Sequence, residues 1–105
     1  MAKPKLVLTA APTFKSKVAI PVPGGQPAVV EFTMKGRTKD EFKEFINALA
    51  GRDDIDVLMD IISGWDLEDA FNRDAVEKMD QIYIGAARAI IERYIAELTA
   101  ARLGN

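Results

Sequence analysis

The sequence predicts an α+β fold in which an N-terminal β-hairpin precedes about four α-helices in a single small domain. Two segments that alternate in polarity, residues 14–20 and 28–34, flank a stretch rich in proline and glycine, and a period of two is typical of half-buried strands. From residue 38 onward apolar residues recur every three or four positions, the period of an amphipathic helix. A chain of 105 residues is long enough for one domain with its own core.

Both strands of the hairpin place apolar side chains at every second position. The residues expected on the buried face are Phe14, Ser16, Val18 and Ile20 in the first strand and Ala28, Val30, Phe32 and Met34 in the second. Between them, residues 21–27 hold three prolines and two glycines, which is typical of a loop longer than a tight turn. We expect an ordinary loop, and a projecting finger that docks a partner is the alternative. The hairpin is assigned to residues 14–35 and a loose arm to residues 1–13.

The helical part is assigned to residues 38–103, and its first helix has the clearest start signal. Thr38 and Glu41 are spaced as in a capping box, in which each side chain accepts a hydrogen bond from the other residue's backbone amide. One face of this helix is expected to carry its apolar residues Phe42, Phe45, Ile46 and Leu49. Gly51 is expected to end the helix, because glycine readily adopts the conformation that follows a last helical turn.

A second helix is expected to begin where Asp53 or Asp54 can cap it and to end at Gly64. Its apolar stripe consists of Ile55, Leu58, Met59 and Ile62. The aspartates of this segment, which include Asp56 and Asp60, lack the spacing, the glycine and the glutamate of a calcium loop. We therefore expect them to form a solvent-facing side of the helix and not a metal site.

Two further helices follow a short connection at residues 65–67. Asn72 is a suitable cap for a third helix that reaches about Gln81. Gly85 interrupts the apolar pattern before the last helix, which is expected over roughly residues 86–102. Arginine and glutamate four residues apart recur on the solvent side of this last helix, a spacing that favours ion pairs.

The residue types that are missing exclude several kinds of chemistry. The chain has no histidine and no cysteine, so it has no disulfide, no thiolate nucleophile and no cysteine-ligated metal. Gly24 and Gly25 lie between prolines in the hairpin loop and do not open a helix, so they make no dinucleotide-binding turn. We therefore expect a protein-binding module that is not an enzyme, with no catalytic residue, no cofactor and no metal.

The charged residues are unevenly distributed along the chain. Residues 1–37 hold six basic side chains and one acidic side chain, whereas residues 53–69 hold seven acidic side chains and no basic one. These segments can attract each other within one chain or between copies, so a homo-oligomer is an open alternative. Six scattered basic side chains form only a small positive surface for phosphate groups, so we expect that this protein does not bind nucleic acid. No apolar run approaches the roughly 20 residues of a membrane span, so we expect a cytosolic protein.

Several aromatic residues and their neighbours lie at helix ends or on helix faces, where they are candidates for partner contact. These candidates are Trp65, Asp66, Leu67, Phe71, Tyr83 and Tyr94. For the single tryptophan, the favoured interpretation is a wedge between helices whose indole N–H donates to a nearby carboxylate or carbonyl. An exposed anchor for a partner is the alternative.

A series of short motifs then extends along the chain in a fixed order. The second half has Gly64-Trp65-Asp66-Leu67, Phe71, Tyr83 through Ile90, Tyr94 through Leu98 and Ala100 through Arg102; the first half has Pro12 through Lys15, Ile20 through Gly25, Phe32 through Lys35 and Arg37-Thr38. In the order and spacing of these motifs, over roughly residues 12–102, the chain resembles the small tail assembly chaperones of long-tailed bacteriophages. It departs from the family pattern at Ile84, where the family has proline.

The resemblance implies a non-catalytic protein made in the cytoplasm of an infected or lysogenic host cell. It implies two partners, the tape measure protein, which the chaperone coats and keeps soluble, and the tail tube protein, which it helps to recruit. It also implies absence from the mature virion, and it transfers no catalytic residue to this chain. A structural tail or head-completion component of the virion and a small regulatory binding protein are the alternatives.

Overall fold

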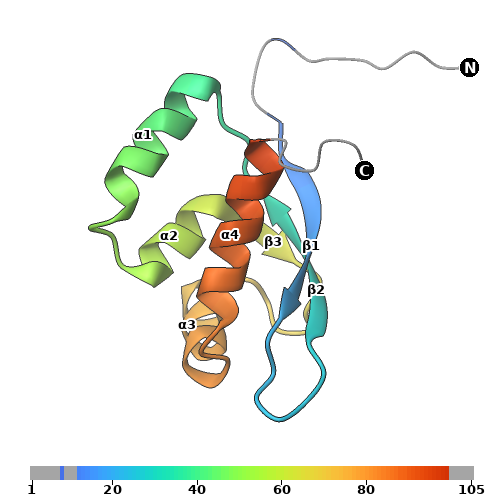
Figure 1. Ribbon diagram of the computed structural model, residues 1–105. Helices are drawn as coiled ribbons and strands as arrows, with labels where there is room; N and C mark the ends of the chain where they lie inside the picture. The colour runs from blue at the N-terminus through green and yellow to red at the C-terminus, as the bar shows by residue number, and fades with distance from the viewer. Residues whose placement is uncertain (1–7, 9–11, 100–105) are drawn as a thin grey trace, which may run out of the picture.

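A computed structural model describes residue 8 and residues 12–99, and within them it confirms the α+β class with a three-stranded antiparallel sheet and four helices (Figure 1). Strands β1 (Phe14–Ile20) and β2 (Ala28–Met34) form the predicted hairpin with the predicted bounds. The third strand, β3 (Ile62–Trp65), pairs with the other edge of β2. Most of the arm predicted for residues 1–13 lies outside the described residues.

The hairpin buries the face that the alternation predicted. Val18 lies opposite Val30, and Ser16 lies opposite Phe32. All four of these side chains are buried, whereas Ala28 at the start of β2 is exposed. The buried Ser16 is not left without partners, because its hydroxyl donates to a carboxylate of α4 at 2.6 Å and accepts from a guanidinium of α4 at 3.0 Å. The polar position in the predicted apolar face is therefore satisfied by the helix that covers it.

The sequence prediction missed β3 and extended the second helix too far. That helix ends at Ile61, and the chain then turns into a strand in which Ile62 pairs with Met34 and Trp65 pairs with Phe32. Gly64, which was predicted to end the helix, lies within the strand. The pairing supplies partners to backbone groups of β2 that would otherwise form an open edge. A buried isoleucine is compatible with both a helix and a strand, so the apolar periodicity of this segment did not show where α2 ends and β3 begins.

The helices begin at the predicted caps. In chain order they are α1 (Lys39–Leu49), α2 (Asp54–Ile61), α3 (Arg73–Ile82) and α4 (Ala86–Leu98). The side chains of Thr38, Asp53 and Asn72 each accept a hydrogen bond from the first turn that follows, and Thr38 forms the complete capping box. Helix α4 ends at Leu98 with Thr99 as its C-cap, before the end predicted at about residue 102.

The core lies between the sheet and the helices α2 and α4. Helix α4 packs along β1, and α2 packs against both α4 and β3 (Figure 1). The largest fully buried side chains come from β2, β3, α2 and α4: Phe32, Met34, Leu58, Ile61, Ile62, Ile90 and Tyr94. Helix α1 stands apart, because Phe45 is its only buried residue, and Ile46, predicted on the buried face, is exposed.

Replacing Thr38 with alanine is expected to weaken α1 selectively. The change removes the hydroxyl that accepts from the Glu41 amide at 3.2 Å, and such a loss costs about 1 kcal/mol. Amide hydrogen exchange of α1 should become about fivefold faster, because local opening of this weakly packed helix becomes easier. Thr38→Ser keeps the acceptor and is the matched control. Equal exchange in Thr38→Ala and Thr38→Ser would contradict the assignment.

Candidate functional site

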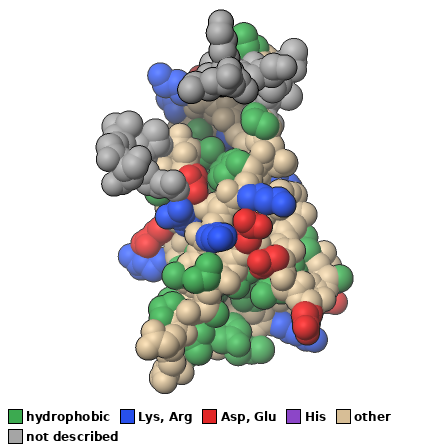
Figure 2. All heavy atoms as spheres, turned by 90° about the vertical axis from the view of Figure 1, so that its right-hand side faces the viewer, with side chains coloured by type: hydrophobic (Ala, Val, Ile, Leu, Met, Phe, Trp, Pro, Cys, Tyr) green, Lys and Arg blue, Asp and Glu red, His purple; other side chains and the backbone are tan. Residues whose placement is uncertain are grey.

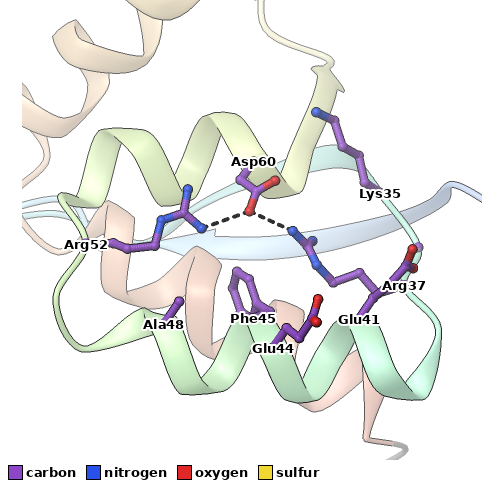
Figure 3. Close-up of a pocket in the computed structure, with 9 residues that line it drawn as sticks. Lys35, Arg37, Glu41, Glu44, Phe45, Ala48, Arg52 and Asp60 are labelled. Atoms are coloured by element: carbon purple, nitrogen blue, oxygen red, sulfur yellow. Dashed lines mark hydrogen bonds and ion pairs between the residues drawn. The ribbon is translucent and has the colours of Figure 1, made fainter.

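Arg37, in the segment between β2 and α1, connects four separate parts of the fold, and Figure 3 shows it between Asp60 and Phe45. The guanidinium of Arg37 donates to the hydroxyl of Tyr94 on α4 at 2.6 Å and to Oδ2 of Asp60 on α2 at 2.6 Å. Its carbon centre lies 4.5 Å from the ring centroid of Phe45 on α1, which is within cation–π distance. The only buried residue of α1 is therefore held against the body by this charge and by an edge-to-face contact with the ring of Tyr94, 5.6 Å between centroids.

Asp60 is shared between two arginines, since it also accepts from Nη1 of Arg52 at 2.9 Å. Burial acts to raise the pKa of this carboxyl group, but the Arg52 hydrogen bond and the charges of Arg37, Arg52 and Lys35 outweigh it. The pKa of Asp60 therefore lies below its usual value of 3.8. Asp60 thus lies at the edge of the predicted solvent-facing side, because its side chain is 36% exposed but is held in ion pairs with Arg37 and Arg52. The attraction between the basic first segment and the acidic middle occurs within one chain.

Tyr94 completes this cluster from inside the core. Its hydroxyl donates to the backbone oxygen of Lys35 at 2.6 Å, and its side chain is fully buried. Burial is the main cause that raises its pKa, against the opposing effect of Arg37. A pocket of about 400 Å³ opens in front of the cluster, between α1 and α2. Among the charged side chains that line it, Arg37, Arg52 and Asp60 form ion pairs, whereas Lys35, Glu41 and Glu44 form none with the described residues. Because Arg37 bonds both Asp60 and Tyr94, we assign these three residues a structural role.

A second hollow, here called the Trp65 groove, lies between the segment after β3 and helix α3. It has a volume of about 380 Å³ and is lined by Trp65, Leu67, Glu68, Asp69, Ala75, Lys78, Met79, Ile82 and Tyr83. The indole N–H of Trp65 donates to the backbone oxygen of Asp69 at 2.7 Å, and its ring packs edge to face on Phe71 with 5.2 Å between centroids. The predicted hydrogen bond from the indole N–H to a carbonyl is confirmed, whereas the half-buried ring lies at the end of β3 and packs on Phe32 and Phe71, not between two helices.

The six residues predicted for partner contact are therefore separated in space. Trp65, Leu67 and Tyr83 line the Trp65 groove, and Phe71 supports the indole from behind. Asp66 is turned toward β2, where its backbone amide and its carboxylate bond the backbone of Glu31, each at 3.1 Å. Tyr94 lies in the core and offers no surface to a partner in this structure.

Sequence reasoning missed the contribution of the end of α3 to this surface. Ile82 is 62% exposed and Ile84 is 84% exposed, on either side of the half-buried Tyr83. Three large apolar residues in succession cannot all face the core at a helix end, and that signal was present in the sequence. The side chain of Pro21 lies against Gly85, where an added Cβ would stand 3.1 Å from its Cγ.

The hairpin loop thus adjoins the end of α3 and continues the apolar surface. Figure 2 shows hydrophobic side chains gathered at the lower end of one face, below a band of charged side chains. The exposed residues of that loop include Pro21, Pro23 and Pro27, and Val29 on β2 is 65% exposed. Within the described part of the chain, no group of three acidic side chains is arranged to hold a metal ion, and no helix has the length and hydropathy of a membrane span.

Replacing Asp60 with asparagine is expected to destabilise the fold by about 1–2 kcal/mol at pH 7, because two arginines lose their shared carboxylate. A carboxyl group with a lowered folded-state pKa contributes stability above its unfolded value, here 3.8, and loses it as the pH falls further. The difference in unfolding free energy between wild type and Asp60→Asn should therefore shrink below pH 4. Urea unfolding from pH 7 to pH 2.5 measures it, and a constant difference would contradict the pairing.

Comparison with known proteins gave one family. No match was found among curated proteins or among solved structures. A family model described as phage tail assembly chaperone matches residues 1–105, which is the whole chain. The agreement extends across the hairpin, the Arg37 cluster and the Trp65 groove alike, so it is not confined to one motif. This chain therefore belongs to the phage tail assembly chaperone family.

Proposed function

We propose that this chaperone binds the tape measure protein in the host cytoplasm, keeps it soluble and helps tail tube subunits to assemble, without catalysis and without remaining in the virion. Family membership supports the general role. The observation that supports binding is the Trp65 groove, beside which Ile82 and Ile84 lie largely exposed. Contiguous exposed apolar side chains with a polar rim are typical of protein-binding surfaces.

The groove is suited to hold apolar segments transiently. Trp65 is fixed by its hydrogen bond to Asp69 and by Phe71, so it can contact a partner without first being ordered. Met79 lines the groove with a flexible side chain that adapts to differently shaped apolar residues. Fully burying one isoleucine side chain contributes about 1.5–3 kcal/mol, so a few such contacts suffice for reversible binding.

Within the predicted set of contact residues, we propose different roles. Trp65, Leu67 and Tyr83 would contact the partner directly, together with Ile82. Phe71 and Asp66 would hold the contacting segment in place, the first by packing on the indole and the second by its hydrogen bond to the β2 backbone.

Co-expression with the neighbouring tape measure protein tests this function. The wild-type chain is expected to keep the tape measure protein in the soluble fraction and to co-purify with it. Ile82→Lys should abolish most of this effect, because a charge replaces an exposed apolar contact while a cation in the last turn of α3 is favourable for the helix. Ile46→Lys, the same change at an exposed position on α1 outside the Trp65 groove, is the matched control and should retain the effect.

Two results would contradict the proposal. One is wild-type chain that neither binds nor solubilises the tape measure protein. The other is equal loss in Ile82→Lys and Ile46→Lys, which would mean that the effect of Ile82→Lys is not specific to the Trp65 groove. Detection of the chain in purified particles by mass spectrometry would identify it as a structural virion component instead.

A further inference from the structure

A separate groove lies on the helical side of the molecule, where α1, α2 and α4 meet. This α4 groove has a volume of about 430 Å³ and is lined by Leu49, Arg52, Asp54, Val57, Arg88, Ile91, Glu92 and Ile95. Its floor is aliphatic, with Leu49 from α1, Val57 from α2, and Ile91 and Ile95 one turn apart on α4. The volume falls within the range of about 300–1,000 Å³ that is common for ligand clefts.

The groove exists because α1 does not close over α4. Helix α1 is held through Phe45 on Arg37, and its last residue, Leu49, remains only half-buried. Ile91 and Ile95 on the facing side of α4 are also half-buried. Three helices thus surround an aliphatic trough, which is the geometry that accepts apolar side chains at helical spacing from a further amphipathic helix.

The charges around this trough are not balanced. Arg52 is paired with Asp60, and Arg88 is paired with Glu92 at 3.0 Å. Asp54 is the one lining charge that has no oppositely charged partner within ion-pair distance in residues 12–99.

Further acidic groups lie close to Asp54. Asp80 belongs to the last turn of α3, where the helix dipole disfavours an anion and no basic residue is present. Burial, and then the charges of Asp54 and Asp53, raise the pKa of Asp80. Acidic groups therefore gather near the Asp54 end of the groove, and Asp54 has no ion-pair partner among the described residues, although the start of α2 offsets part of its charge.

We propose that the α4 groove is a second docking site, which holds an amphipathic helix of the chaperoned protein whose aliphatic stripe adjoins a lysine or arginine that pairs with Asp54. The proposal rests on the proposed function for the existence of that partner. The α4 helix of a second copy fits less well, because its Arg88 is already paired with Glu92, and the crosslinking described next distinguishes a second copy from the chaperoned protein. The two grooves would allow one chaperone to hold two segments of one extended partner.

Site-specific photo-crosslinking in the full chain locates the occupant. A photoreactive phenylalanine is introduced at Arg88 in the α4 groove or at Lys78 in the Trp65 groove, and each variant is co-expressed with the tape measure protein. The probe at position 88 should capture a segment with aliphatic residues at helical spacing beside a basic residue. This segment should differ from the one captured at position 78. Capture of a second copy at position 88, or the same segment at both positions, would overturn the proposal.

A charge exchange tests the role of Asp54 with a synthetic peptide of the captured segment. Asp54→Lys should weaken peptide binding about tenfold, since attraction is replaced by repulsion. Asp40→Lys is the matched control, because it removes an equivalent acid from the first turn of α1 outside the groove. A peptide whose basic residue is changed to glutamate should regain affinity for Asp54→Lys.

The outcomes of the two proposals are distinguishable. Equal loss in Asp54→Lys and Asp40→Lys, or no recovery with the exchanged peptide, would overturn the α4 site. If wild-type chain meanwhile solubilises the tape measure protein, the proposed function stands without this site. If wild-type chain binds no segment of the tape measure protein, both proposals fall. Thermal unfolding of each variant confirms that the fold is intact.

Discussion

The guanidinium of Arg37 is the interaction on which the arrangement of the helices depends. It leaves the end of β2 and meets Asp60 of α2, the hydroxyl of Tyr94 on α4 and the ring of Phe45 on α1. Aliphatic packing alone would not fix where α1 sits, because this helix buries a single residue. The cluster is fully satisfied, and no buried side-chain nitrogen or oxygen atom in the described residues lacks a hydrogen-bond partner. The charged, directional contacts of Arg37 thus fix the relative positions of the helices, and apolar side chains pack in the space between them.

Local signals in the sequence were sufficient for the hairpin and the helix starts. The capping box of Thr38 and Glu41 and the alternation of the two long strands depend only on neighbouring residues, and both were predicted with correct bounds. Strand β3 was not predictable in this way, because its four residues become a strand only by pairing with Phe32 and Met34 far back in the chain. Local propensity cannot report such a distant pairing partner.

The candidate surfaces, too, were predictable where they depend on local residue types and not where they depend on how distant segments pack. Trp65 and Leu67 were identified because their residue types stand out beside a helix end, whereas the roles of Ile82 and Met79 depend on how α3 is laid beside the segment after β3. The uneven distribution of charge indicated an attraction between the first segment and the middle of the chain. It did not indicate that two arginines would share Asp60, whereas Asp54 would have no ion-pair partner among residues 12–99.

The loose attachment of α1 has an energetic consequence for binding. Leu49 belongs both to this helix and to the wall of the α4 groove, so opening of α1 removes one side of that groove. By thermodynamic linkage, any chain held in the groove raises the free energy needed to open α1. The ordering of α1 likewise lowers the entropy cost of the next contact that the partner makes. The rate at which α1 opens would therefore depend on whether a partner chain occupies the α4 groove, although this helix contributes little to the core.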